Sequence, residues 1–147
     1  MIKGYNIKII YKRTKNKFGD MQMLSSKDCY DVLKDIYKDN MDHYEAFNVM
    51  LLDTKNSIID IVQVGQGNNR GVVINTNAIF QAAILANADK IILSHNHPSG
   101  NLTLSDKDKE ITTKMIKSAK LMDKEILDHI VISRNGYVSM ADEDLLK

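Results

Sequence analysis

The chain has 147 residues, of which 44% are hydrophobic and 27% charged, so it is long enough to form one domain with a buried core. Its formal net charge of +1 gives no general electrostatic attraction to nucleic acid or to an anionic membrane. No apolar run approaches the roughly 20 residues that span a bilayer, and no signal peptide is recognisable, which predicts a cytoplasmic protein. The single cysteine, Cys29, excludes an internal disulfide, and we expect its side chain to be half-buried.

The first part of the chain is predicted to contain a strand, a basic stretch and a helix. Residues 2–11 alternate imperfectly between apolar and polar, which is typical of a strand. The stretch KRTKNK at 12–17 follows, and we expect a solvated loop there rather than a phosphate-binding strip. Helical spacing of apolar residues begins after Ser25, which predicts a helix with a serine N-cap. The apolar residues with this spacing are Cys29, Val32, Leu33, Ile36 and Tyr37.

The middle of the chain is predicted to form a hairpin, a short extended piece and a helix. Residues 45–53 (EAFNVMLLD) are largely apolar, as in a buried strand, and residues 57–67 form a second strand after a turn. Residues 71–76 add the extended piece. Residues 77–87 are rich in alanine, which predicts a helix that can pack closely on a sheet.

Strands and helices alternate in the last part of the chain. Residues 89–97 are predicted to be a strand and residues 105–122 a long amphipathic helix. Residues 126–133 and 137–140 form a strand pair around an Arg-Asn-Gly turn. With the earlier hairpin, this order predicts the α/β class, with a mixed β-sheet flanked by helices.

Two histidines, His95 and His97, end the strand predicted at 89–97. Side chains two residues apart on a strand point to the same face, so the two imidazoles converge while Asn96 points the other way. Pro98 cannot donate to a sheet ladder, so the histidines lie at the open end of the strand, where α/β sheets commonly place their sites. This is the arrangement that two metal ligands require.

Ser105 and Asp108 begin the next predicted helix. Ser105 is a plausible N-cap, and Asp108 lies in the first turn, where the helix dipole favours a carboxylate. Residues 98–104 are long enough to fold back and present Asp108 to the histidines. Two histidines and one aspartate are the ligands of a catalytic zinc with an open position for water. The residues therefore predict a Zn²⁺ site of His95, His97 and Asp108; the alternative is structural histidines and a capping aspartate.

The segment HNHPSG at 95–100, followed by Ser105 and Asp108, resembles the JAMM metal-binding motif. This form of the motif is similar to that of the RadC-like branch of the JAB/MPN metalloprotein family. The resemblance covers nearly the whole chain from about Glu45 onward. It departs at Leu104, where family members often have a proline that stiffens the loop, so the departure concerns the loop and not a ligand.

The resemblance implies the JAB/MPN (cytidine-deaminase-like) architecture as a single domain over 1–147. Residues 1–44 are its N-terminal strand and helix, and residues 45–147 are the metal-site core. The implied activity is that of a zinc-dependent metallopeptidase or isopeptidase, which cleaves an amide bond in a peptide substrate with a metal-activated water.

The resemblance also implies two catalytic residues. Glu45 is the general base, and independently it opens an otherwise apolar strand, so its carboxylate lies at a strand end beside the core. Ser105 is the residue that hydrogen-bonds the developing oxyanion, a role that we expect to compete with its role as N-cap.

Other functions stay open at this point. The RadC name carries a repair label, so the alternative is a DNA-repair or mobile-element accessory protein. Longer RadC-like proteins have a helix-hairpin-helix region, but residues 1–44 show no such helical pair, although they carry nine lysines and arginines against six aspartates. We expect at most weak, salt-dependent contact with nucleic acid. The candidate contacts are Lys12, Arg13, Lys15 and Lys17.

Two further hypotheses are disfavoured by the residues present. A metal-free scaffold is a weak alternative because every ligand position is filled. A zinc nucleobase deaminase needs a Pro-Cys-x-x-Cys segment, which Cys29 alone cannot supply.

Asp128 and His129 either support the site from behind its ligands or form a structural pair. We expect His43 to be a surface residue.

Overall fold

The computed structural model describes residues 17–67 and 73–147, which form three helices and five strands. In chain order these are α1 (Ser26–Tyr37), β1 (Ala46–Leu52), β2 (Ile58–Gln66), α2 (Thr76–Leu85), β3 (Lys90–Asn96), α3 (Asp106–Leu121), β4 (Glu125–Ser133) and β5 (Gly136–Ser139). The strand predicted at 2–11 and all of the basic stretch except Lys17 lie outside the described residues. Of the extended piece predicted at 71–76, residues 73–75 have no regular secondary structure and Thr76 begins α2.

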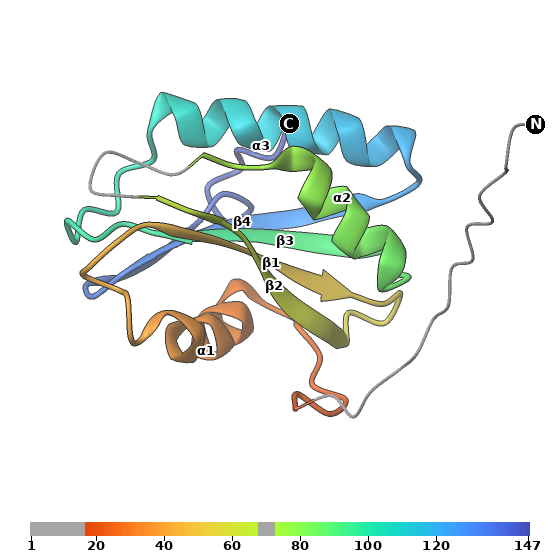
Figure 1. The fold of residues 1–147 in the computed structure, drawn as a ribbon, viewed down its shortest axis with the longest axis horizontal. Helices are drawn as coiled ribbons and strands as arrows, with labels where there is room; N and C mark the ends of the chain where they lie inside the picture. Colours follow the sequence, from red (N-terminus) through yellow and green to blue (C-terminus); the bar gives the residue numbers. More distant parts are fainter. Residues whose placement is uncertain (1–16, 68–72) are drawn as a thin grey trace, which may run out of the picture.

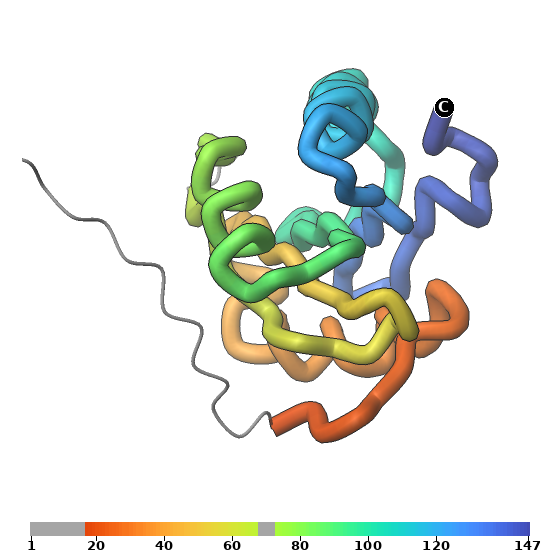
Figure 2. The backbone as a smooth tube through the Cα atoms, turned by 90° about the vertical axis from the view of Figure 1, so that its right-hand side faces the viewer, coloured from red at the N-terminus to blue at the C-terminus, as the bar shows by residue number. Residues whose placement is uncertain are grey.

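The strands form one sheet in the order β2-β1-β3-β4-β5. The β3 and β4 strands are parallel and joined through α3, whereas the other neighbours are antiparallel, so the sheet is mixed. Figures 1 and 2 show α2 and α3 on one side of the sheet and α1 on the other. The predicted α/β class, with a mixed sheet flanked by helices, is confirmed.

Helix covers the sheet on both faces, which produces two apolar cores. All seven residues of β1 are buried, because successive side chains alternate between the two cores. The core under α2 and α3 includes Phe47, Val49, Leu51, Ile79, Ala83, Ile91, Leu93, Met115 and Ala119. The core under α1 includes Cys29, Leu33, Tyr37, Met50, Leu52, Ile92, Ile130 and Ile132.

Side-chain caps explain where two of the helices begin. The predicted cap is confirmed: Ser25 accepts a hydrogen bond from the backbone N–H of Asp28 at 3.2 Å. The α2 helix starts at Thr76, one residue before the predicted helix, because the side chain of Asn75 accepts from the N–H of Ala78 at 3.2 Å.

Cys29 lies deeper than predicted. It is only 3% exposed, because it belongs to the apolar face of α1 that packs on the sheet. Burial raises the pKa of its thiol to about 12, so the side chain is an inert part of the core.

The longest described helix is α3, with 16 residues. Within residues 17–67 and 73–147, no helix has the length and apolar content needed to cross a membrane.

Leu93 on β3 tests the importance of the core under α2 and α3. Its side chain is fully buried, so Leu93→Ala leaves a cavity in that core and we expect the free energy of unfolding to fall by about 2–5 kcal/mol. Leu121→Ala is the matched control, because Leu121 is 88% exposed and its loss should cost less than about 0.5 kcal/mol. Urea denaturation measures both, and equal losses in the two variants would contradict this account of the core.

Candidate metal centre

Four side chains with metal-ligating atoms meet at the end of β3. His95 Nε2 lies 3.0 Å from His97 Nε2, 3.1 Å from Asp108 Oδ1 and 3.8 Å from Glu45 Oε1. His97 Nε2 lies 3.6 Å from Asp108 Oδ2. The ligand atoms of Glu45, His95 and His97 all lie within 4.8 Å of one another, so these three residues could hold a metal ion. The structure thus brings together the predicted base and the three predicted ligands.

Strand pairing explains why Glu45 reaches histidines that are about fifty residues further along the chain. The β1 and β3 strands are antiparallel, with Phe47 opposite His95. The residue just before β1 therefore lies at the same end of the sheet as the last residues of β3. His97 continues the pairing of β3 with β4, because its backbone N–H donates to the carbonyl of Ile132 at 2.8 Å.

Asn96 fixes the backbone on both sides of Glu45. It points to the opposite face from the histidines, as predicted, and is fully buried there. Its Oδ1 accepts from the N–H of Ala46 at 2.8 Å, and its Nδ2 donates to the carbonyl of Tyr44 at 2.9 Å. The same Nδ2 lies 3.0 Å from the carbonyl oxygen of Met41. The asparagine between the two histidines therefore positions the predicted base.

The loop after His97 determines which nitrogen of that histidine faces the centre. His97 Nδ1 lies 2.7 Å from the carbonyl oxygen of Asn101. A carbonyl oxygen can only accept, so Nδ1 carries the proton, and in the neutral ring Nε2 presents its lone pair to the other three side chains.

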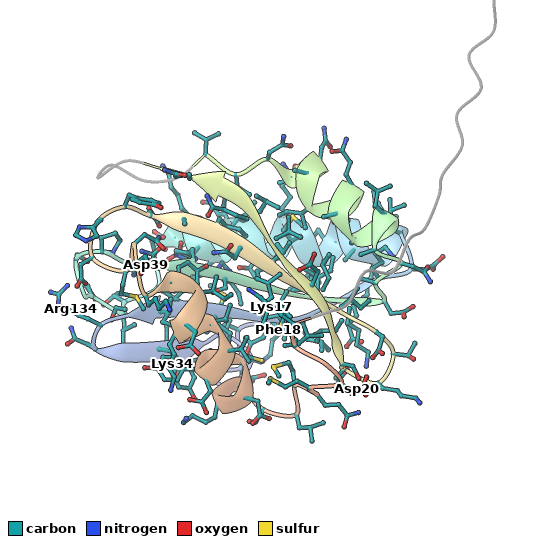
Figure 3. All side chains as sticks on the ribbon, turned by 60° about the horizontal axis from the view of Figure 1, so that its bottom comes forward. Lys17, Phe18, Asp20, Lys34, Asp39 and Arg134 are labelled. Carbon is teal, nitrogen blue, oxygen red and sulfur yellow. The ribbon has the colours of Figure 1, made fainter. Side chains whose placement is uncertain are left out.

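Arg134 holds this loop from the turn between β4 and β5. Its guanidinium donates to the carbonyls of Pro98 and Ser99 at 3.0 and 2.9 Å. Gly100 has a φ of +84°, which strains any residue with a side chain, and a Cβ there would lie 2.5 Å from the guanidinium carbon and displace Arg134. These contacts hold the first three residues of the loop, 98–100. Figure 3 labels Arg134.

Asp108 and Ser105 form a capping box at the start of α3. Ser105 Oγ accepts from the N–H of Asp108 at 3.0 Å, and Asp108 Oδ2 accepts from the N–H of Ser105 at 2.9 Å. This confirms Ser105 as the N-cap. It also fixes the carboxylate of Asp108 so that its other oxygen, Oδ1, points at His95.

The charges of the centre shift the pKa values of its members. Burial alone would raise the pKa of Asp108, but the neighbouring rings of His95 and His97, together with the N–H of Ser105, hold it far below its ordinary range. The Asp108 carboxylate correspondingly raises the pKa of His97, against the opposing effect of burial. The Asp108 carboxylate is therefore ionised and contributes negative charge to the centre.

Comparison with known families is consistent with this geometry. The model of the RadC-like JAB domain matches residues 23–145. The chain belongs to the RadC-like JAB domain family.

Several relatives of this RadC-like JAB domain are UPF0758 proteins. One from Syntrophomonas wolfei is 32% identical over 152 aligned positions, which cover 99% of this chain and 65% of that protein. Another, from Symbiobacterium thermophilum, is 38% identical over 69% of this chain and 44% of its own length. A third, from Clostridioides difficile, is 39% identical over 69% of this chain and 43% of its own length. The chain spans roughly half the length of the relatives that it matches.

His129 and Asp128 play different parts in the RadC-like domain. His129 is fully buried, and its Nε2 lies 2.8 Å from His95 Nδ1, so it contacts a predicted ligand directly. Desolvation holds the pKa of His129 well below its ordinary value, so the ring is neutral. Asp128 instead accepts from Ser139 Oγ at 2.6 Å and from the N–H of Ala141 at 2.9 Å, which anchors the C-terminal segment.

Sequence reasoning missed Thr112. Its Oγ1 lies 2.6 Å from His129 Nδ1, on the far side of that ring from His95. The available signal was its position on α3, four residues after Asp108 and so on the same helix face. That spacing alone does not identify the histidine that it contacts.

A cavity of about 1190 Å³ opens over the centre. Glu45, His95, His97, Ser105 and Asp108 line it, together with apolar side chains from β1, from the segment before α2, from the loop after β3 and from α3. These apolar residues are Phe47, Val73, Ile74, Pro98 and Ile111. The cavity therefore gives a substrate access to all five predicted site residues.

The remaining predictions concern residues away from this cavity. His43 is exposed, as predicted. Of the four basic residues considered for nucleic-acid contact, Lys17 alone is described. Its Nζ lies 4.9 Å from the ring centroid of Phe18 (Figure 3). Weak nucleic-acid binding stays a prediction.

Asn96→Ala tests the positioning of Glu45. The variant leaves the buried N–H of Ala46 and nearby carbonyls without their partner, so we expect the free energy of unfolding to fall by about 1–3 kcal/mol. We also expect faster hydrogen exchange at the amide of Ala46. Asn77→Ala on exposed α2 surface is the control. Unchanged exchange at Ala46 would show that Asn96 does not hold this segment.

Proposed function

We propose that this RadC-like JAB domain is a zinc-dependent hydrolase that cleaves an amide bond in a peptide or isopeptide substrate. The observation that carries the proposal is the convergence of ligand atoms from His97, Asp108 and Glu45 on His95 Nε2, at 3.0, 3.1 and 3.8 Å. Imidazole nitrogen with carboxylate oxygen is a ligand combination typical of catalytic zinc sites. The open cavity above the centre supports a catalytic rather than a closed structural site.

Two carboxylates compete for the place of third ligand, and we propose Asp108. Its Oδ1 is the nearer to His95, and the bond from Ser105 N–H to Oδ2 fixes its orientation. The carboxylate of Glu45 lies farther away and, among residues 17–67 and 73–147, has no hydrogen-bond partner. A carboxylate without a hydrogen-bond partner that fixes it suits a group that accepts and delivers a proton.

The proposed roles follow from these contacts. Zinc, when bound, would lower the pKa of water at the site toward neutrality. Glu45 takes the proton of the attacking water and returns it to the departing amine. His95, His97 and Asp108 hold the cation, and the apolar cavity wall formed by Ile74 and Ile111 positions the substrate.

Ser105 can act as N-cap and as oxyanion donor together. Its oxygen accepts from the N–H of Asp108, which uses a lone pair and leaves the hydroxyl hydrogen free. That hydrogen can be donated to the carbonyl oxygen of a substrate as negative charge develops there. Since the cap uses a lone pair and the oxyanion contact would use the hydrogen, the two roles of Ser105 need not compete as we expected.

Metal content tests the ligand assignment. We expect one zinc per domain in the wild-type protein, and little in the double variant His95→Ala, His97→Ala or in Asp108→Asn, because an amide oxygen is a poorer ligand than a carboxylate. His43→Ala is the matched control, since that histidine is exposed. Elemental analysis of purified protein provides the measurement. Unchanged zinc in the double variant would overturn the proposed centre.

Glu45→Gln separates the base from the ligands. We expect this variant to keep its zinc and its melting temperature while hydrolysis falls about 10²–10⁴-fold, which is the usual contribution of general-base catalysis. The assay is cleavage of a peptide library with and without chelator. Loss of zinc would instead assign Glu45 to the ligand set with His95 and His97, and full turnover would place the base elsewhere.

A further inference from the structure

We infer that Thr112 is a positioning residue that sets the tautomers of His129 and His95, and so directs the lone pair of His95 Nε2 toward the metal centre. The inference rests on the proposed function in one respect, which is that His95 is a metal ligand. The orientation of the hydrogen bonds follows from the structure and does not depend on the substrate.

Three hydrogen bonds in series connect α3 to His95. Thr112 Oγ1 lies 2.6 Å from the backbone carbonyl oxygen of Asp108 and 2.6 Å from His129 Nδ1. On the other side of that ring, His129 Nε2 lies 2.8 Å from His95 Nδ1. Thr112, His129 and His95 are no more than 2% exposed, so water is excluded from the series.

The carbonyl of Asp108 determines the direction of every bond in this series. A carbonyl oxygen only accepts, so the single hydroxyl hydrogen of Thr112 is donated to it. The oxygen of Thr112 then acts as acceptor toward His129, whose Nδ1 must carry a proton. A neutral imidazole has one N–H, so His129 Nε2 accepts from His95 Nδ1. The remaining nitrogen of His95, Nε2, is left without a proton.

That remaining nitrogen is the one that the centre needs. His95 Nε2 faces His97 Nε2 and the carboxylates of Asp108 and Glu45. Histidine binds a metal through an unprotonated nitrogen, and the hydrogen bond at the other nitrogen selects the tautomer. In this chain the selection is made by a second histidine, which has no fixed direction of its own, so the hydroxyl at the end of the series supplies it.

Removing the hydroxyl should reverse the series. In Thr112→Val the Nδ1–H of His129 has no acceptor in a buried site, which is unfavourable. The alternative tautomer avoids this cost by moving the proton of His129 to Nε2, from which it is donated to His95 Nδ1. His95 then carries its own proton on Nε2, where it blocks metal binding.

The experiment compares wild-type protein with three variants. Thr112→Val has nearly the same shape without the hydroxyl, and Thr112→Ser restores the hydroxyl. Thr113→Val is the matched control, because the exposed Thr113 makes the equivalent helical bond, to the carbonyl of Lys109 at 3.0 Å, and no contact with a histidine. Long-range ¹H–¹⁵N correlation spectra of the imidazoles, recorded after dialysis against chelator, report the tautomers. Competition with a chromophoric chelator reports the affinity for Zn²⁺.

We expect the proton of His95 on Nδ1 in the wild-type, Thr112→Ser and Thr113→Val proteins, and on Nε2 in a substantial fraction of Thr112→Val. We expect the affinity of Thr112→Val for Zn²⁺ to be about 10- to 100-fold weaker, as is usual when a partner of a metal-binding histidine is removed. A wild-type His95 that is protonated on Nε2 overturns the inference without any variant. Wild-type tautomers and affinity in Thr112→Val, or no rescue by Thr112→Ser, also overturn it.

The two readouts distinguish failure of this inference from failure of the proposed function. If the tautomers change as expected and no protein binds Zn²⁺, Thr112 sets the tautomers and the proposed zinc centre is wrong. If all proteins bind Zn²⁺ equally and the tautomers do not change, the centre stands and Thr112 has only a structural role.

Discussion

The antiparallel pairing of β1 with β3 is the constraint on which the site depends. Both strands are buried on both faces, so a shift of their register by one residue would exchange the two cores. The observed register sets Phe47 opposite His95. Glu45, which precedes β1, therefore lies at the end of β3. The apolar packing of these two strands thus brings Glu45 and the histidines to one end of the sheet.

Because side chains alternate along β3, the two histidines and the asparagine of the HNH sequence face opposite sides of the sheet. His95 and His97 face α3 and the cavity, whereas Asn96 faces the segment that links α1 to β1. One short stretch thereby supplies two proposed ligands and the side chain that orders the backbone around the proposed base. The α3 helix supplies the rest of the centre, through the carboxylate of Asp108 and the hydroxyl of Thr112.

Local patterns indicated most of the fold and the three proposed metal ligands, and the family resemblance added Glu45 and Ser105. Neither revealed the contacts that orient these side chains. Helix caps such as Ser25 and strands of two-residue period depend on neighbours in sequence, so the residues alone indicate them. The roles of Asn96 and Thr112 depend on partners that tertiary packing brings together, including carbonyl groups that no side-chain pattern reveals. His129 could support the site or be purely structural, and the choice likewise required knowledge that its ring contacts His95.

The closeness of several lone pairs explains why the protons of the two imidazoles matter to the centre. Among the four converging groups, His97 Nε2 and the two carboxylates present lone pairs, and the series from Thr112 adds the lone pair of His95 Nε2. Acceptors this close repel one another unless a proton or a cation lies between them. The raised pKa of His97, caused first by the Asp108 carboxylate, reflects the same preference for positive charge. Because partners outside the centre hold the protons of both imidazoles, a cation held by His95, His97 and Asp108, as proposed, would supply the positive charge that these lone pairs need.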